Sequence, residues 1–471
     1  MTEIITKTAL ADTFLQQKEY FASNTYPSYQ ERINDLVKLK AMLIDNQEAF
    51  IDAMSQDFGH RSAADSRIGD ILTTVMGINY AIKKLKKWMK PDKKHIGILF
   101  QPAKGQVVYQ PKGVIGIIAP WNYPIFLTLG PLTTALAAGN TAMVKMSEYT
   151  PKTNTLLAQL IADIFPRNKV AIVCGDADMA AAFSSITFDH LFFTGSTSVG
   201  KLVMKAAAEN LVPVTLELGG KSPTIIDNDI DIKTAVSRLI LGKTLNAGQT
   251  CVAPDYIFCP ENKVAELTQA FQTAYQSMYP SIEKNDDYSC IINDGQKSRL
   301  DSLLADAKAQ GATITPLSKG SDDSTCRKMP LTLITDVNDD MTVMQQEIFG
   351  PLLPIIGYKN INEAIAYINS KPRPLALYIC SFNKSFQQQV LLNTHAGGVC
   401  INDAAFHVAV DDLPFGGIGA SGMGQYHGDE GFKTFSHGKA VLSRGRISFG
   451  SLLFPPFGNK IHQILFKFFI R

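Results

Sequence analysis

Hydrophobic residues recur with a helical period in the first ninety residues of the chain. Between residues 29 and 58 the apolar positions are three or four residues apart, a spacing that places them on one face of a helix. A second helical segment follows at residues 67–90. The N-terminal region is therefore predicted to be helical.

After residue 106, short apolar runs alternate with segments of helical period. The run at 113–119 is typical of a fully buried strand, and residues 127–138 have the pattern of a helix. The alternation continues at 140–145, 152–164, 170–174, 190–194, 199–209 and 214–218. This order predicts a doubly wound parallel sheet with helices on both faces, and such sheets bind ligands at the carboxyl ends of their strands.

A second alternating stretch predicts another α/β lobe. It starts near residue 223, passes through 354–356 and reaches 378–380, so we place the boundary between the lobes near residue 218. From residue 397 the chain is rich in glycine, and after residue 440 it ends in an apolar tail.

Composition excludes several classes of protein. A chain of 471 residues with 45% apolar residues is typical of a soluble enzyme of two or three domains. The net charge of +2 gives no field that would attract nucleic acid, and no stretch approaches the ~20 apolar residues of a membrane span. The seven cysteines form no CxxC pair and have no histidine at ligand spacing, which argues against a metal site and a disulfide scaffold. Reduced thiols and an N-terminus without a signal sequence predict a cytoplasmic protein.

Two glycine-rich segments match phosphate-binding patterns only in part. Residues 195–201, with the sequence GSTSVGK, follow a predicted strand and begin a predicted helix, but Leu202 stands where a hydroxyl would hold Mg²⁺. Free N–H groups at such a helix start also suit the pyrophosphate of a dinucleotide. The second segment, GIGASG at 417–422, follows Pro414 and is better explained as a connecting loop.

Cys251 and Glu217 are the candidate catalytic pair. Cys251 lies among small residues in NAGQTCVA, and Glu217 enters a diglycine turn in LELGGK. A thiol that attacks and a carboxylate that activates water are the two groups that covalent aldehyde oxidation requires. Taken alone, a cysteine is more often a small buried hydrophobe, and a glutamate is more often an ion-pair partner.

Seven motifs stand in the order and approximate spacing of the NAD(P)-dependent aldehyde dehydrogenases, and the chain resembles that family over its whole length. The wording at 199–223 resembles the class 3 branch, and residues 57–61 and 99–103 look most like bacterial coniferyl aldehyde dehydrogenases. The motifs are PWNYP at 120–124, KMSE at 145–148, FTGS at 193–196, LELGGKSP at 216–223, GQTC at 248–251, EIFGP at 347–351 and PFGG at 414–417.

The resemblance implies a role for each catalytic residue. Cys251 is expected to form a thiohemiacetal whose oxyanion is held by the Cys251 backbone N–H and the Asn122 amide. After hydride transfer, Glu217 is expected to activate the water that hydrolyses the thioester. The sequence alone would rather make Asn122 the cap of a turn between two prolines.

The resemblance also implies a dinucleotide site. It places Lys145 and Glu148 at the adenosine ribose, Gly195 and Ser196 at the pyrophosphate, and Glu347 with Phe349 at the nicotinamide ribose. The carboxylate of Glu148 favours NAD, although Lys145 nearby leaves NADP possible. Met146 follows Lys145 where many relatives have proline, so this loop is expected to be less rigid.

The resemblance yields a complete prediction for the protein. The expected fold is α/β, with a dinucleotide-binding domain at 1–94 and 110–218, a catalytic domain at 219–395, a bridging or oligomerisation element at 95–109 and 396–440, and a tail at 441–471. The expected function is oxidation of an aldehyde, aromatic and such as coniferyl aldehyde, to its acid by a homodimer. The alternatives are a fatty or other aliphatic aldehyde dehydrogenase and, outside this class, a P-loop ATPase or a non-catalytic dinucleotide-binding protein.

The apolar tail resembles the position of the membrane anchor in fatty aldehyde dehydrogenases. Pro455, Pro456 and Gly458 interrupt it, and its last apolar run is about half a bilayer span. The tail is therefore expected to pack on the protein, at a subunit contact or near the substrate entrance.

Overall fold

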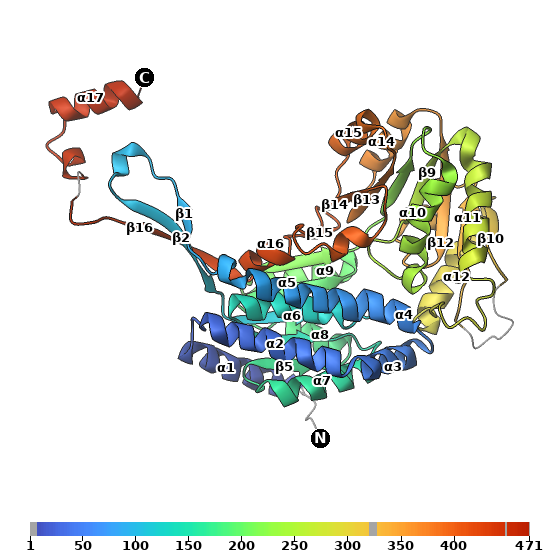
Figure 1. The fold of residues 1–471 in the computed structure, drawn as a ribbon, viewed down its shortest axis with the longest axis horizontal. Coiled ribbons are helices and arrows are strands. Elements are labelled where there is room, and N and C mark those ends of the chain that lie inside the picture. Colours follow the sequence, from blue (N-terminus) through green and yellow to red (C-terminus); the bar gives the residue numbers. More distant parts are fainter. Residues whose placement is uncertain (1–6, 320–326, 448–449, 471) are drawn as a thin grey trace.

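The computed structural model describes residues 7–319, 327–447 and 450–470. These residues form two α/β lobes and a long β arm that projects from them, with the C-terminal helix at the far end of the arm (Figure 1). One of the seven cysteines, Cys326, lies outside the described residues.

The first lobe contains the predicted doubly wound sheet. Its six strands have the order β15-β7-β6-β3-β4-β5, and all neighbours are parallel except β15 with β7. The chain runs outward in one direction from β3 to β5 and in the other from β6 to β7, which is the topology that places ligands at the carboxyl edge. The strands are β3 Val114–Ile118, β4 Thr141–Lys145, β5 Val170–Val173, β6 His190–Gly195, β7 Val214–Leu218 and β15 Gly422–Met423.

Alternate residues of β3 enter two separate cores. Ile115 and Ile117 pack with the helices on one face, whereas Val114 and Ile118 pack with those on the other. A strand buried on both faces needs a continuous apolar run, and this is why residues 113–119 have no polar alternation. The helices of this lobe are α1 Lys7–Ser23, α2 Tyr29–Asp45, α3 Gln47–Phe58, α5 Thr73–Trp88, α6 Phe126–Ala138, α7 Pro151–Ile164, α8 Ala177–Ser184 and α9 Thr197–Ala208.

The two long helices predicted near the N-terminus are each interrupted. Asn46, with φ −115° and ψ 17°, separates α2 from α3, and its amide donates to Met42 O at 2.8 Å. The second predicted segment, 67–90, begins with one π-helical turn, η1 (Arg67–Leu72), before α5, and the short helix α4 (Ala63–Ser66) precedes it. Both interruptions keep the apolar period, so hydrophobic spacing alone could not reveal them.

The second lobe contains a seven-stranded sheet of order β10-β11-β12-β9-β8-β13-β14. Only the β10–β11 pair is antiparallel. The strands are β8 Pro223–Ile226, β9 Tyr256–Pro260, β10 Thr313–Pro316, β11 Thr332–Thr335, β12 Leu352–Tyr358, β13 Ala376–Cys380 and β14 Gly398–Ile401. The helices are α10 Ile232–Thr244, α11 Val264–Met278, α12 Asp294–Ala309, α13 Thr342–Gln345, α14 Ile361–Ser370 and α15 Lys384–Asn393, with the short turns η3 Leu245–Gly248, η4 Glu261–Lys263 and η5 Phe406–Ala409.

The arm is an antiparallel sheet of three strands, β1-β2-β16. Its strands are β1 Asp92–Lys94, β2 Lys104–Pro111 and β16 Ser436–Ser443, and the turn η2 (Ile98–Phe100) lies between β1 and β2. Residues 396–440, predicted as part of a bridging element, also supply β14 to the second lobe, β15 to the first lobe and the helix α16 (Gly428–Thr434). Residues 396–440 therefore contribute to both lobes as well as to the arm.

The tail extends away from both lobes (Figure 1). It contains the turn η6 (Gly450–Leu453) and the helix α17 (Lys460–Phe469), whose residues Phe466 and Phe468 are exposed, as is Phe457 before the helix. The prediction that the tail packs on the protein is wrong for its own chain, because the arm carries it beyond the body, whereas a subunit contact stays a prediction. No helix among the described residues is long and apolar enough to cross a membrane.

Gly139 ends the helix α6, which follows the loop that carries Asn122. Its φ is 91°, and a Cβ there would lie 2.7 Å from the Arg32 guanidinium carbon. Arg32 is buried and donates to Ala137 O and Ala138 O at the end of α6, so it has no room to move aside.

We expect Gly139→Ala to lower the free energy of unfolding by about 2 to 4 kcal/mol, from backbone strain and overpacking together. Gly311→Ala is the matched control, because Gly311 has φ 95° but open space around its Cβ position. The control should cost only about 1 kcal/mol of strain. Denaturant unfolding of both variants measures the difference, and equal losses would show that Arg32 makes no steric contribution.

Candidate functional site

The carboxyl edge of the six-stranded sheet gathers the predicted residues of the first lobe. Asn122 lies in the loop after β3, Lys145 ends β4, Ser196 follows β6, and Glu217 lies near the end of β7. Parallel strands end at the same edge, so residues far apart in sequence meet there.

The predicted nucleophile lies just after a strained turn. Asn246 and Ala247 have φ 50° and 52° in the turn η3, and Gly248 follows with φ 73°. Left-handed backbone at two residues that are not glycine persists only where the surroundings hold it. A Cβ on Gly248 would lie 2.6 Å from Gly350 O, so this position admits no side chain. The turn directs Cys251 to the wall of a pocket between the two lobes.

Glu217 is buried, and neither of its carboxylate oxygens has a hydrogen-bond partner. Burial raises the pKa of this carboxyl well above its ordinary value. A buried acid without a partner is costly for the fold, and such groups cluster at functional sites. A carboxylate with a raised pKa is a stronger base, which suits the role predicted for Glu217 of accepting a proton from water.

Glu347 is a second carboxyl at the same place. Burial and the negative charge of Asp255 raise its pKa to about 8, although a backbone N–H of Gly220 favours the ionised form. A Cβ on Gly219 would lie 2.1 Å from Glu347 Oε2, so the diglycine turn after Glu217 leaves room for this carboxyl.

The carboxyls of Glu217 and Glu347 both influence the pKa of the Cys251 thiol. Burial, together with the smaller effect of the negative charges of Glu347 and Glu217, raises the pKa of Cys251 to about 12. The backbone N–H groups of Cys251 and Val252 oppose this shift. Cys251, Glu217 and Glu347 therefore form one electrostatically coupled group, in which protonation of an acid makes the thiolate easier to form.

Asn122 lies against the nucleophile loop and does not cap its own turn. It is buried, and its amide donates to Gln249 O at 3.1 Å. In return the amide of Asn246 donates to Asn122 O at 3.0 Å. An amide nitrogen carries two hydrogens, so the second N–H of Asn122 is able to serve an oxyanion formed near Cys251.

An apolar pocket leads to the thiol. None of the described residues that line it is an acid, a lysine, an arginine or a histidine. Aromatic and aliphatic side chains from both lobes form its walls, among them Ile68, Tyr123, Phe126, Leu241, Phe406 and Val408, with Cys251 and Thr250 at the lobe interface. A neutral, apolar molecule suits such walls.

The residues predicted to bind the adenosine half of a dinucleotide lie together at β4. Lys145 is almost fully buried and donates to Gly175 O at 2.7 Å, and its ammonium lies 3.5 Å from the partly exposed Glu148 carboxylate. Met146 is buried, and its backbone N–H donates to Val173 O. A proline at this position would lack the N–H that makes this hydrogen bond, and the lower rigidity of the loop stays a prediction.

The pyrophosphate and nicotinamide residues also fit a dinucleotide. Ser196 caps α9 by accepting from Val199 N at 3.4 Å, so the first N–H groups of this helix face the sheet edge. The buried Thr194 Oγ1 and Glu347 Oε1 have no partner in this structure, which leaves polar groups for a ligand. Phe349 has φ 47°, and its ring lies 5.4 Å from that of Trp121.

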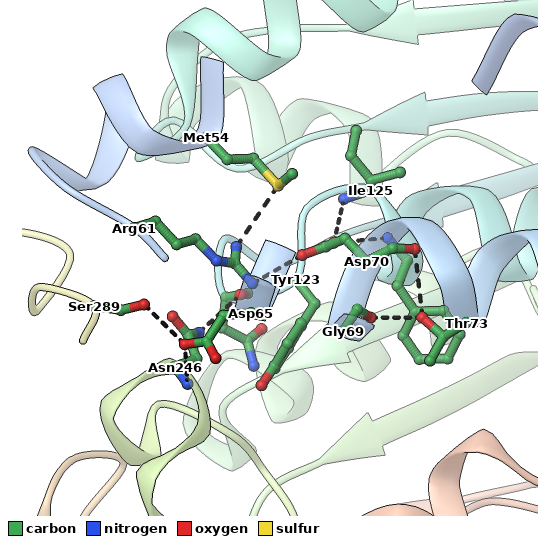
Figure 2. A network of polar contacts seen from close by, with 12 residues as sticks. Met54, Arg61, Asp65, Gly69, Asp70, Thr73, Tyr123, Ile125, Asn246 and Ser289 are labelled. Carbon is green, nitrogen blue, oxygen red and sulfur yellow. Dashed lines mark hydrogen bonds and ion pairs between the residues drawn. The ribbon is translucent and has the colours of Figure 1, made fainter. Parts of the chain in front are cut away.

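Sequence reasoning missed a buried polar network next to these loops. Figure 2 shows Arg61 paired with Asp70 and, beside them, Asp65 in contact with Asn246. Asp65 and Asp70 belong to no motif, and an isolated aspartate in a helical segment is usually exposed. No signal in the sequence alone would have found them.

The chain belongs to the aldehyde dehydrogenase family, whose model matches residues 9–441. Enzymes of this family are oxidoreductases, and the protein accordingly oxidises aldehydes to carboxylic acids. The predicted family and α/β fold are confirmed. The assignment also favours an enzyme over the two alternatives outside the class.

Several relatives are similar over nearly the whole chain. A probable coniferyl aldehyde dehydrogenase of Pseudomonas aeruginosa is 51% identical, covering 97% of this chain and 96% of that protein. The rat aldehyde dehydrogenase family 3 member B1 is 37% identical, covering 96% of each. Among solved structures, a substrate-bound Staphylococcus aureus AldH has a TM-score of 0.92 at 38% identity, covering 98% of this chain and 99% of that one.

A solved relative also agrees with the predicted cofactor class. The Mycobacterium tuberculosis aldehyde dehydrogenase, 27% identical with a TM-score of 0.85, was solved as a complex with NAD⁺ and covers 94% of this chain and 91% of its own.

The coupling of the thiol to two acids has a measurable consequence. Glu347→Gln or Glu217→Gln removes a negative charge that raises the thiol pKa, so the thiolate should form at lower pH in either variant. We expect iodoacetamide to alkylate Cys251 several-fold faster at pH 8 in each variant than in the parent protein. Peptide mass spectrometry across a pH series measures the rate. Unchanged rates in both variants would show that the acids are neutral in the resting protein.

Proposed function

We propose that the protein oxidises an aromatic aldehyde, such as coniferyl aldehyde, to its acid with NAD as the hydride acceptor. One observation carries the proposal: the Cys251 thiol ends an apolar pocket beside a buried carboxyl, Glu217, that has no partner. The choice of aldehyde is supported by the names of two relatives, the probable coniferyl aldehyde dehydrogenase of Pseudomonas aeruginosa and the coniferyl aldehyde dehydrogenase of a Pseudomonas species, which is 46% identical over 92% of this chain.

The residues divide the reaction into two halves. The Cys251 thiol loses its proton to water, the thiolate sulfur attacks the carbonyl carbon, and the resulting oxyanion accepts hydrogen bonds from the Asn122 amide and the Cys251 N–H. Bound NAD⁺ supplies the acceptor for the hydride that leaves this carbon, and a thioester remains on Cys251. Glu217 then takes a proton from water as the water attacks the thioester, and the thiol group leaves as the acid forms.

The dinucleotide is proposed to lie along the carboxyl edge of the first sheet. Lys145 and Glu148 would hold the adenosine ribose, Gly195 and Ser196 the pyrophosphate, and Glu347 with Phe349 the nicotinamide ribose. The orphaned Glu347 Oε1 and the capped start of α9 support this placement.

The pocket walls favour an uncharged substrate. Phe126 and Phe406 place aromatic rings in the lining, and aromatic pairs gain about 0.5 to 1.5 kcal/mol beyond the burial of their area. The same walls would also accept an alkyl chain, which makes an aliphatic aldehyde the second candidate. A charged aldehyde would lose hydration without gaining an ionic partner.

We also propose that the protein is cytoplasmic and forms a homodimer. The six cysteines in the described part of the chain are thiols and form no disulfide, as in a reducing compartment. The projecting arm exposes Ile98, Leu99 and Leu442, and apolar side chains gathered on an arm favour contact with a second subunit.

An aldehyde panel tests the proposed activity. We expect NADH formation to be fastest, by kcat/KM, with coniferyl and cinnamyl aldehydes, slower with octanal and slowest with the charged succinic semialdehyde.

Cys251→Ala should abolish turnover and keep NAD binding, because the thiol makes the covalent bond and the fold does not need it. Cys400→Ala is the matched control, a partly buried thiol in β14 that does not line the pocket, and should retain activity. Octanal as the best substrate would favour the aliphatic alternative, and an active Cys251→Ala would overturn the mechanism.

The position of Glu148 leads us to expect a preference for NAD over NADP. Its carboxylate would accept from the ribose 2′-OH but would repel a 2′-phosphate. Two charges about 4 Å apart in water interact by about 1 kcal/mol, so Glu148→Gln should narrow the NAD to NADP ratio of kcat/KM by about five- to tenfold. A higher kcat/KM with NADP in the parent protein would contradict the preference. If Glu148→Gln leaves the ratio unchanged, the preference for NAD does not depend on Glu148.

A further inference from the structure

We propose that Asp65, supported by the buried Arg61–Asp70 ion pair, is a positioning residue that fixes the nucleophile loop against the loop of Asn122. Asp65 touches neither the thiol nor the pocket, and it acts through the backbone of Asn246. The inference rests on the catalytic roles proposed above for Cys251 and Asn122.

Asp65 holds the strained turn from the side of the first lobe. One of its carboxylate oxygens accepts from the backbone N–H of Asn246 at 2.9 Å and from Ser289 Oγ at 2.9 Å (Figure 2). Ser289 Oγ also accepts from the N–H of Ser62, so three segments meet at this carboxylate. The N–H that Asp65 binds belongs to the first residue of the turn with left-handed backbone, where φ is 50°.

The ion pair holds the other loop. Asp70 Oδ1 accepts from the backbone N–H groups of Ile125 and Phe126 at 3.0 Å each, which fixes the start of α6 just after Asn122. Its second oxygen pairs with the Arg61 guanidinium at 2.8 Å, and both side chains are fully buried. Arg61 in turn lies against the ring of Tyr123, 5.1 Å from its centre.

Direct contacts then join the two loops that these acids hold. Tyr123 and Thr250 share a hydrogen bond of 2.9 Å between their hydroxyls, next to both Asn122 and Cys251. A Cβ on Gly69 would lie 2.5 Å from the Tyr123 ring, so the turn that carries Asp70 also confines this ring. The residues between 61 and 70 therefore contact both loops and set their separation.

Asp65 contacts the backbone of the nucleophile loop and not the reacting atoms, so its effect on the reaction is indirect. Its contacts are confined to this junction, so the expected effect is on the position of the two loops. Without the Asp65 carboxylate, the Asn246 N–H would lose its partner, and the left-handed turn would relax toward ordinary backbone. The sulfur would shift relative to the Asn122 amide, and misplacement by about 1 Å can lower a rate by about 10²-fold. Cofactor and aldehyde sites do not include Asp65, so binding should change little.

The test compares Asp65→Ala with Asp65→Asn in the full-length protein. For Asp65→Ala we expect kcat to fall by about 10- to 100-fold, with KM for the aldehyde and Kd for NAD within about twofold of the parent values. Amide hydrogen exchange should become faster in peptides covering 122–126 and 245–252 and stay unchanged elsewhere. Asp65→Asn keeps one acceptor oxygen and should recover part of kcat and of the exchange protection.

Asp35→Ala is the control for a loss of stability alone. Asp35 is a nearly buried carboxylate of the same lobe whose ion pair, at 2.6 Å, is with Lys169 outside both loops. It should lower the melting temperature without a selective change in the two loop peptides or in kcat.

Parent-like kcat and exchange in Asp65→Ala would overturn the proposal. If that variant does not fold, Asp65→Leu decides it, because leucine fills a similar volume without an acceptor oxygen, and parent-like exchange and kcat in that variant would overturn the proposal equally. Should the parent protein oxidise no aldehyde, or Cys251→Ala stay active, the proposed function fails, whereas hydrogen exchange at the two loops still tests the positioning.

Discussion

Two hydrogen bonds between the lobes determine whether this molecule has an active site at all. The Asn122 amide donates to Gln249 O, and the Asn246 amide donates to Asn122 O. Neither lobe holds both halves of the site, because Asn122 and Glu217 belong to the first sheet whereas Cys251 follows α10 of the second lobe. Gln249 secures the junction, since its side chain also bonds Asn246 O, Cys290 O and the N–H of Ile292.

Buried carboxyls in this junction differ sharply in how they are compensated. Asp70 has the guanidinium of Arg61 and two backbone N–H groups, and Asp65 has two donors. Glu217 has none. An ionised carboxyl without a partner costs several kcal/mol inside a protein, and this is why burial raises the pKa of Glu217. Asp65 and Asp70, which have hydrogen-bond donors, hold the backbone, whereas Glu217, which has none, is available for proton transfer.

The sequence predicted the parallel doubly wound sheet of the first lobe and three strands of the second, near β8, β12 and β13, because each follows from local apolar patterning. It did not predict β9, β10, β11 or β14. It did not predict the breaks at Asn46 and η1, since both preserve the hydrophobic period. It also missed Asp65 and Asp70, whose partners lie far along the chain and appear only once the lobes have docked. The tail was misplaced because composition cannot show that an arm carries it away from the body.

Glycines also help to position Cys251 and Glu347, because they allow close approach of the backbone segments next to these residues. A side chain at Gly248 would meet Gly350 O, and one at Gly350 would meet Leu300 at 2.6 Å. The turn before Cys251 and the segment after Glu347 are thus in backbone contact, which fixes the thiol and this carboxyl relative to each other without a bond between their side chains. Left-handed residues lie on both sides of this contact, Asn246 and Ala247 on one and Phe349 on the other. Strain of this kind persists only in surroundings that hold the backbone, so the small residues around Cys251 are explained by close backbone approach as much as by access to the thiol.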